Sequence, residues 1–285
     1  MKKTFKALIF SMFALLICVL PSKALGEYKG SSSVIDTSDA AQGYFSARYT
    51  AGGTTKIKVM VEKDGAKYTY DLKADGTTEK YPLQLGDGKY KIRVLRNTSG
   101  TKYATVQTVY ENVTLESPFA PYLHSNQYVN YTADTGVVKT AAQLISQSSD
   151  RLTQVDSVYK YVTDAMTYDK NKAATVQSGY LPNVDQVVAD KKGICFDYAS
   201  VMAAMLRSQG IPTKLVTGYV APNNAYHAWN EVWVEGKGWV KTGSIYFDGV
   251  SWTLMDPTFT SAGKDSKYIS NFIGDGTNYT KKYEY

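Results

Sequence analysis

The stretch that decides the fold of this chain is GICFDYASVMAAMLRSQGIPTKLVTGY, residues 193–219. Its first part predicts one apolar face of a helix, because apolar side chains recur at spacings of three and four: Ala199, Met202, Ala203 and Leu206. Gly210 and Pro212 are expected to end this helix. The residues after Pro212 return to a strand pattern, so a helix that begins at Cys195 leads directly into a sheet.

The residues before this stretch predict two more helices. A helix capped by Asp150 is indicated by apolar residues at helical spacing: Leu152, Val155, Val158, Tyr159 and Val162. A shorter helix is expected from a cap at Asn183 to an exit at Gly193.

The residues after the stretch predict antiparallel strands. Three runs alternate with a period of two and are separated by turns: HAWNEVWV (227–234), WVKTGSIYF (239–247) and SWTLMDPTF (251–259). Helices followed by antiparallel strands indicate an α+β domain.

The first half of the chain has a different periodicity. From about residue 43 to residue 115 apolar and polar residues alternate, and Asp64-Gly65 and Asp87-Gly88 stand between alternating runs as hairpin signals. Several short strands at this spacing predict a small antiparallel β-sandwich. Since this half shows no cluster of titratable residues and no metal-ligand spacing, it is expected to position or bind rather than to react.

The first residues predict export. A basic start, an apolar core with too few residues to span a bilayer, and small residues at Ser22 and Ala24 are typical of a secretory signal peptide over residues 1–24. Cys18 lies inside that core, so Cys195 would be the one cysteine of the mature chain. An unpaired cysteine in a secreted protein is an intermolecular link or a reactive thiol, although free cysteine also occurs as a small buried hydrophobe.

The net charge excludes some partners. Four lysines in residues 1–24 account for four of the six net positive charges, so the rest of the chain carries +2. This balance gives no reason to expect nucleic acid or an anionic membrane as a partner.

Cys195 is expected at the first turn of its helix. Unpaired N–H groups and the helix dipole favour negative charge at that end. A thiol titrates near ~8.5 in water, and a helix N-terminus lowers that pKa and raises the thiolate fraction. The position favours a reactive thiol but also occurs for structural cysteines.

A thiolate nucleophile needs a base, and the chain has two histidines. His124 lies in a linker-like segment, whereas His227 begins a strand on which Trp229, Glu231 and Trp233 share its face.

A third group would orient the imidazole. Asp256 ends a strand before Pro257 and shares a face with Trp252 and Leu254, and a carboxylate beside apolar groups is costly unless it is paired. The alternative is that Asp256 caps a turn with Pro257 and Thr258.

The ordered run of motifs resembles one known family. The stretch 193–219, followed by YHAWNEVWVEGKGWV (226–240) and WTLMDPTF (252–259), is similar to the core of the transglutaminase-like superfamily, relatives of the papain-type thiol enzymes. The resemblance covers most of residues 150–260 and implies a helix that begins at the cysteine and packs on an antiparallel sheet. It implies Cys195 as nucleophile, His227 as general base and acid, and Asp256 as the orienting residue.

This chain departs from the family pattern by an extra hairpin, KTGSIYFDGVS (241–251), which makes Asp248 a rival to Asp256. The chemistry that the resemblance implies is acyl transfer through a Cys195 thioester, with no cofactor and no metal. One oxyanion donor would be the Cys195 backbone N–H. The second donor is not identified, and Tyr168 and Gln186 are upstream candidates.

These observations predict a signal peptide over 1–24, a β-sandwich-like module over 27–120, a linker over 121–138 and a transglutaminase-like domain over 139–285. The expected function is that of a thiol enzyme, secreted or at the cell surface, which transfers glutamine side chains to amines on a protein or cell-wall peptide substrate. Nucleic acid and stable membrane insertion after signal cleavage are not expected. The alternatives are a cysteine peptidase or amidase with the same triad, and a non-catalytic surface-binding protein. Trp229, Trp233 and Trp252 are candidates for the cleft walls or for core packing. The oligomeric state is left open.

Overall fold

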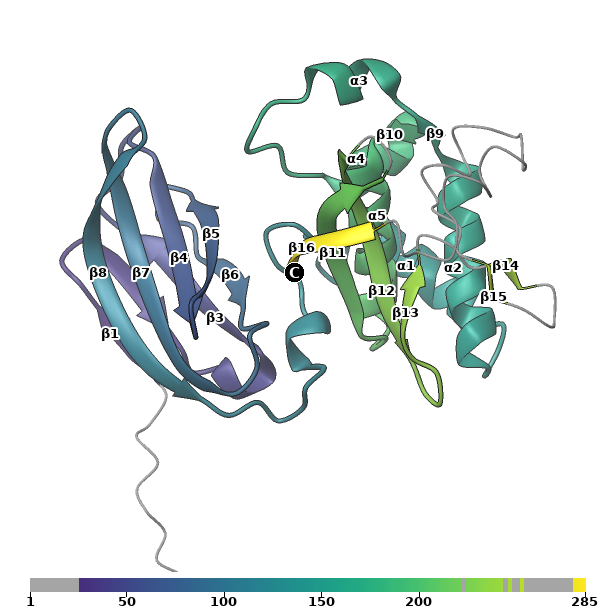
Figure 1. The fold of residues 1–285 in the computed structure, drawn as a ribbon, viewed down its shortest axis with the longest axis horizontal. Coiled ribbons are helices and arrows are strands. Elements are labelled where there is room, and N and C mark those ends of the chain that lie inside the picture. The colour runs from purple at the N-terminus through teal and green to yellow at the C-terminus, as the bar shows by residue number, and fades with distance from the viewer. Residues whose placement is uncertain (1–25, 222–223, 243–245, 248–251, 254–278) are drawn as a thin grey trace, which may run out of the picture.

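The computed structural model describes residues 26–221, 224–242, 246–247, 252–253 and 279–285. Two lobes lie side by side in Figure 1, an all-β lobe built from β1–β8 and a second lobe built from the helices α1–α5 and the strands β9–β16. The prediction of an α+β fold with antiparallel sheets is confirmed. Among the described residues, no helix combines the length and the apolar character needed to cross a membrane.

The first lobe consists of two four-stranded antiparallel sheets. One sheet has the order β1-β2-β3-β6, formed by Glu27–Lys29, Ser33–Asp36, Tyr44–Tyr49 and Glu79–Pro82. The other has the order β5-β4-β7-β8, formed by Ala66–Leu72, Ile57–Lys63, Gly88–Ser99 and Lys102–Val113. Side chains from both sheets share one core that includes Ile35, Phe45, Val59 and Ile92, all without exposed surface. Short 3₁₀ helices cover Ala40–Gln42 and Ala120–Tyr122.

One of the two predicted hairpins is confirmed and the other is wrong. Asp64 and Gly65 both have positive φ and join β4 to β5 in register. Asp87-Gly88 instead carries the chain between sheets, because β6 pairs with β3 while β7 pairs with β4 and β8. The physical reason is the burial of Leu83, whose carbonyl accepts a hydrogen bond from the Tyr90 hydroxyl.

The second lobe contains the helices α1 (Gly136–Ile145), α2 (Arg151–Ala165), α3 (Lys170–Thr175), α4 (Val184–Asp190) and α5 (Cys195–Arg207). The Asp150 and Asn183 caps are confirmed, since their side chains accept hydrogen bonds from Thr153 N–H and Gln186 N–H. Helix α1, which the sequence analysis did not predict, begins inside the segment expected as a linker.

The predicted ends of two helices need correction. Helix α4 ends at Asp190 rather than at Gly193, because Lys191 adopts the left-handed conformation and the next two residues form a strand. Helix α5 ends at Arg207, and the turn after it closes at Gly210, whose φ is +70°.

The sheet of the second lobe has the order β13-β12-β11-β16, formed by Gly238–Thr242, Ala225–Val234, Thr213–Val220 and Tyr279–Glu284. Two small pairs complete the described strands, β9 (Thr167–Tyr168) with β10 (Lys192–Gly193) and β14 (Tyr246–Phe247) with β15 (Trp252–Thr253). Helix α5 packs on β11 and β12 through a core that includes Met202, Leu215, Ala228 and Val232.

The last strand, β16, lies between the lobes in Figure 1. It extends the sheet of the second lobe by pairing with β11, and its Tyr283 and Tyr285 rings contact Tyr68 of the first lobe. Glu284 accepts a hydrogen bond from the Tyr122 hydroxyl at 2.6 Å and pairs with Lys214 at 3.2 Å.

Candidate functional site

Cys195 is the first residue of α5, as the sequence predicts, and Ile194 is the N-cap in an extended conformation. The side chain is half-buried, and the thiol is free of any disulfide. The first N–H groups of a helix have no partner inside it, so a negative charge on this sulfur would lie beside unpaired donors and the positive end of the helix dipole.

The start of α5 is held by a buried carboxylate that sequence reasoning missed. Asp197 has no exposed surface, and its side chain accepts a hydrogen bond from Ile194 N–H at 2.8 Å. It also pairs with Lys172 Nζ at 2.7 Å and accepts a hydrogen bond from the Tyr180 hydroxyl. Burial, together with that carboxylate, raises the pKa of Tyr180 well above its ordinary value, so the tyrosine stays a donor.

The backbone before Cys195 is packed tightly against that carboxylate. A Cβ atom on Gly193 would lie 2.7 Å from the Asp197 Cβ atom, which is closer than real side chains approach. Gly193 is therefore required by close approach and not by a helix exit.

His227 is the third residue of β12 and is 7% exposed. It lies opposite Gly218 of β11, and its ring is stacked at 6.4 Å on that of Trp229, two residues along the same face. The alternate residues, Ala228 and Asn230, face α5, and the Asn230 amide donates to the Ala199 carbonyl at 3.0 Å. Strand β12 thus connects the histidine directly to the cysteine helix.

Cys195 and His227 line the same pocket, whose volume is about 520 Å³. Six aromatic side chains, from the segment between the lobes and from the second lobe, form part of its wall: Tyr128, Tyr168, Tyr180, Phe196, Tyr226 and Tyr285. Lys58, Thr69 and Asp71 of the first lobe close one side. The pocket therefore lies between the lobes, at the start of the cysteine helix.

Of the other residues singled out from the sequence, Tyr168 lines this pocket and His124 and Gln186 do not. His124 does not line this pocket; its ring packs on Tyr44 at 4.8 Å, and burial, then the charges of Lys80 and Arg207, lower its pKa. Tyr168 is in the wall of the pocket, whereas the Gln186 side chain bonds to Asp190.

The sequence analysis also named two aspartates as candidates for the residue that orients the histidine. Asp256 and its rival Asp248 lie outside the described residues, so the orienting role stays a prediction. Among the described residues, no group of three or more His, Cys, Asp or Glu side chains could hold a metal ion.

Two of the three tryptophans considered as cleft walls pack elsewhere. Trp229 is 3% exposed beside His227 and Tyr279, and Trp233 packs on Phe119 and Trp239. Neither is among the described residues that line the pocket, and the Trp252 side chain is outside the described part.

One family model matches the second lobe of the chain. Residues 138–244 match the model of the transglutaminase-like superfamily, a span that includes α1–α5 and the strands β11–β13. This part of the chain is similar to a transglutaminase-like core. The superfamily includes enzymes of the transglutaminase and cysteine-peptidase types.

Individual relatives match this core in part. The uncharacterized protein YebA of Bacillus subtilis is 28% identical over 197 residues, which cover 61% of this chain and 26% of YebA. A protein-glutamine gamma-glutamyltransferase of Pseudomonas aeruginosa is 36% identical over 76 residues, which cover 22% of this chain and 11% of that enzyme. The chain thus spans about a quarter or less of the curated relatives it matches.

A solved structure also aligns with both lobes. That of a candidate cysteine protease from Cytophaga hutchinsonii has 13% identity and a TM-score of 0.43, over 92% of this chain and 74% of the other. This likeness decides nothing about activity.

Proposed function

We propose that this protein is an exported thiol enzyme that transfers the acyl group of a glutamine side chain to an amine through a thioester on Cys195. The observation that supports it most directly is that Cys195, at the start of α5, lines one pocket with His227 of the adjoining sheet. The resemblance of residues 138–244 to the transglutaminase-like superfamily supports the assignment of the same pair as nucleophile and base. The glutamine substrate is suggested by the relative named as a protein-glutamine gamma-glutamyltransferase.

The proposed reaction has two halves. The Cys195 thiolate attacks the carbonyl carbon of the glutamine amide, the C–S bond forms, and the C–N bond breaks as the His227 imidazolium gives its proton to the departing ammonia. A primary amine then attacks the thioester and loses a proton to His227, so that a new C–N bond forms and the thiolate returns. Both tetrahedral intermediates carry an oxyanion, which the Cys195 backbone N–H would stabilise.

Two further roles belong to the proposal. Asp256 would hold the His227 tautomer, and the aromatic wall would limit the access of water so that an amine can compete for the thioester. With water as acceptor, the same residues would act as an amidase or a peptidase.

The test uses acetyl-Gln-Gly-amide with hydroxylamine as acceptor, and measures ammonia and hydroxamate together. We expect equal amounts of both from the native protein, neither from Cys195→Ala, and unchanged turnover in His124→Ala, which alters the other histidine. Ammonia without hydroxamate would identify an amidase, and cleavage of peptide bonds a peptidase. No turnover of any amide would overturn the enzymatic proposal in favour of a binding protein.

The export step is tested separately. We propose that residues 1–24 act as a signal peptide, and N-terminal sequencing of protein recovered outside the producing cell should then begin at Leu25 or a nearby residue. Intact Met1 on all of the protein would contradict this.

A further inference from the structure

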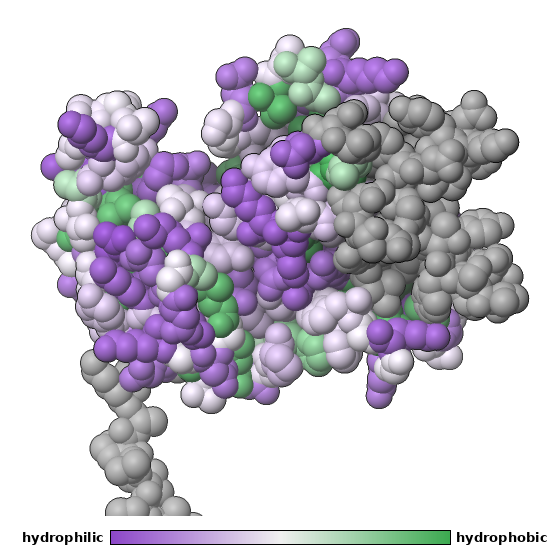
Figure 2. Space-filling view, viewed as in Figure 1, coloured by the Kyte–Doolittle hydropathy of each residue, from purple (hydrophilic) through white to green (hydrophobic). Residues whose placement is uncertain are grey.

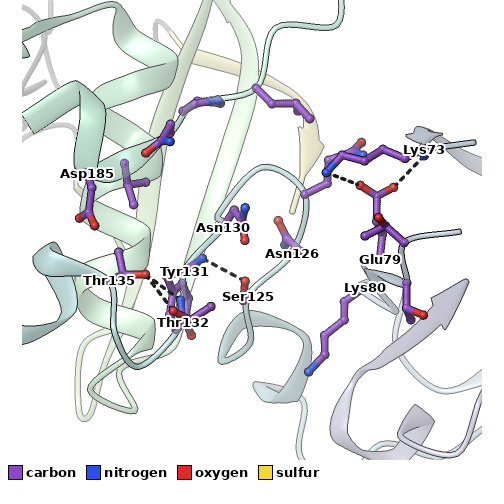
Figure 3. Close-up of a pocket in the computed structure, with 17 residues that line it drawn as sticks. Lys73, Glu79, Lys80, Ser125, Asn126, Asn130, Tyr131, Thr132, Thr135 and Asp185 are labelled. Atoms are coloured by element: carbon purple, nitrogen blue, oxygen red, sulfur yellow. Dashed lines mark hydrogen bonds and ion pairs between the residues drawn. The ribbon is translucent and has the colours of Figure 1, made fainter. Parts of the chain in front are cut away.

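The edge of the first lobe that faces the second lobe borders the candidate active site. Strand β5 contributes Thr69 and Asp71 to the pocket of Cys195, and Lys73, just beyond the end of β5, lines a second hollow of about 750 Å³. In Figure 3, Lys73, Glu79 and Lys80 lie on the side of the first lobe, opposite Asp185 and Thr135. The first hollow therefore borders β5, and the second begins just beyond its end.

The two hollows adjoin, because Gln127 and Leu181 line both of them. They form one groove between the lobes, and Figure 2 shows the surface notched between them. The wall opposite β5 is the segment 177–185, which approaches β5 where a Cβ atom on Gly179 would lie 3.8 Å from the Asp71 carboxylate. In an extended chain, the four residue steps from Thr69 to Lys73 span about 13 Å.

Strand β5 is an edge strand, so one side of its backbone is not used by the sheet. At Asp71 that side is already paired: its N–H donates to the Gln127 side-chain oxygen at 3.3 Å, and its carbonyl accepts from the Gln127 amide nitrogen at 2.8 Å. Gln127 thus occupies the place that a peptide group of a neighbouring strand would take. Because outward groups recur every second residue, the Thr69 N–H and C=O point into the groove on the same side.

We propose that this groove binds an extended polypeptide segment of the acyl-donor substrate, which pairs with the free edge of β5 at Thr69 while its glutamine enters the pocket of Cys195. The inference rests on the function proposed above and adds the substrate class: an unfolded or extended protein segment, recognised through its backbone.

The chemistry of the groove favours a polypeptide over a charged polymer. Lys58 and Asp71 pair with each other at 2.7 Å, and Lys73 pairs with Glu79 at 3.8 Å. The remaining polar lining consists mainly of amide and hydroxyl side chains, including Asn126, Asn130, Thr132 and Thr135. Such groups match the donors and acceptors of a peptide backbone.

The test compares two donors with the same reactive residue, acetyl-Gln-Gly-amide and acetyl-Thr-Val-Thr-Gln-Thr-Val-Thr-amide, in the full chain. The longer donor should have a KM about tenfold lower than that of the shorter one, and Thr69→Pro should raise the KM of the longer donor by about that factor. Proline there removes an outward N–H and leaves the ladder with β4 intact.

Thr108→Pro is the matched control. Thr108 is an exposed residue of β8, the opposite edge of the same sheet, and the strand registers place its N–H outward as well. This variant should leave both donors unaffected. A second test needs no variant: N-methylation of the peptide bonds that flank the glutamine should raise the KM of the longer donor.

The outcomes separate the inference from the proposed function. Turnover of both donors with equal KM, or loss of the length effect in Thr108→Pro as much as in Thr69→Pro, would overturn the groove proposal and leave the thiol enzyme standing. If neither donor reacts, the groove proposal is tested by binding alone. The longer peptide is then labelled with fluorescein and its binding to Cys195→Ala is measured. Binding that Thr69→Pro weakens would support the groove, whereas no binding, or stronger binding of an uncharged glycan oligomer, would overturn it.

Discussion

At the scale of single residues, the environment of Cys195 depends on a compensated charge. Asp197 places a buried carboxylate two residues after the cysteine, where it would oppose a thiolate if it stood alone. Lys172 pairs with it at 2.7 Å, and the same ammonium lies 4.3 Å from the centre of the Tyr180 ring. Because Lys172 neutralises the charge of Asp197, the positive end of the helix dipole can still stabilise a negative charge on the Cys195 sulfur.

Replacing Lys172 should make Cys195 less reactive. In Lys172→Met the rate of iodoacetamide labelling of Cys195 at pH 7 should fall, since an uncompensated carboxylate then lies near the sulfur. Adding Asp197→Asn should restore the rate. Lys170→Met, which replaces an exposed lysine of the same helix, is the control and should leave the rate unchanged. An equal change of the labelling rate in both lysine variants would refute this role of Lys172.

The candidate catalytic residues could be predicted from the sequence better than the residues that surround them. Cys195 and His227 stand out because cysteines and histidines are scarce and because their motifs keep a family order. Asp197 could have been found, since an acidic residue at the third helical position often bonds back to the N-cap N–H. The aromatic wall could not, because its members come from the segment between the lobes and from distant parts of the second lobe.

At the scale of elements, α5 and β12 are joined by a buried amide. Asn230 has no exposed surface, and its side chain donates to the carbonyls of Ala199 in α5 and Lys214 in β11. It is the polar connection among apolar contacts between the cysteine helix and the histidine strand.

Removing this amide should loosen the helix on the sheet. Asn230→Ala leaves two buried carbonyls without their donor, so the free energy of unfolding should fall by about 1–3 kcal/mol, measured by urea titration of tryptophan fluorescence. Asn112→Ala, at an exposed position of β8, should change it by less than about 0.5 kcal/mol. Equal stability of the two variants would show that the amide does not hold α5.

Elements with a local signal were predicted and those without one were not. The caps of α2 and α4 and the turn at Asp64-Gly65 follow from nearby residues. The exit of α4 at Lys191 did not follow, because the left-handed residue there is a lysine rather than a glycine. The hairpin predicted at Asp87-Gly88 was wrong because the residues of a turn do not determine which strands pair.

At the scale of the whole molecule, β16 ties the lobes together. No local pattern predicts that residues 279–284 pair with β11, because the partner is distant in the sequence. Burial by itself would raise the pKa of Glu284, but hydrogen bonds from Lys281 and Tyr122 and the charge of Lys214 outweigh it and lower that pKa. The predicted boundaries of the lobes at 120 and 139 stay a prediction.

The lowered pKa makes the joint between the lobes sensitive to acid. A glutamate whose folded-state pKa is lowered stabilises the fold above its ordinary value of 4.5, and this contribution is lost as the pH falls through the folded-state pKa. At pH 7, Glu284→Gln should therefore be less stable by about 1–3 kcal/mol, and the difference should shrink below pH 4.5. Urea titrations across this pH range measure it, and a difference that does not change with pH would contradict the assignment.

The central claim is that Cys195 and His227 act as a pair, and the rate of iodoacetamide labelling against pH tests it most directly. In a Cys18→Ser background Cys195 is the single thiol, so the signal has one source. A thiol paired with His227 should be labelled fast well below the ordinary thiol pKa of about 8.5, and this should be lost in His227→Ala but not in His124→Ala. Slow labelling with an ordinary midpoint that His227→Ala leaves unchanged would mean that Cys195 is a structural cysteine and that the two residues do not act as a pair.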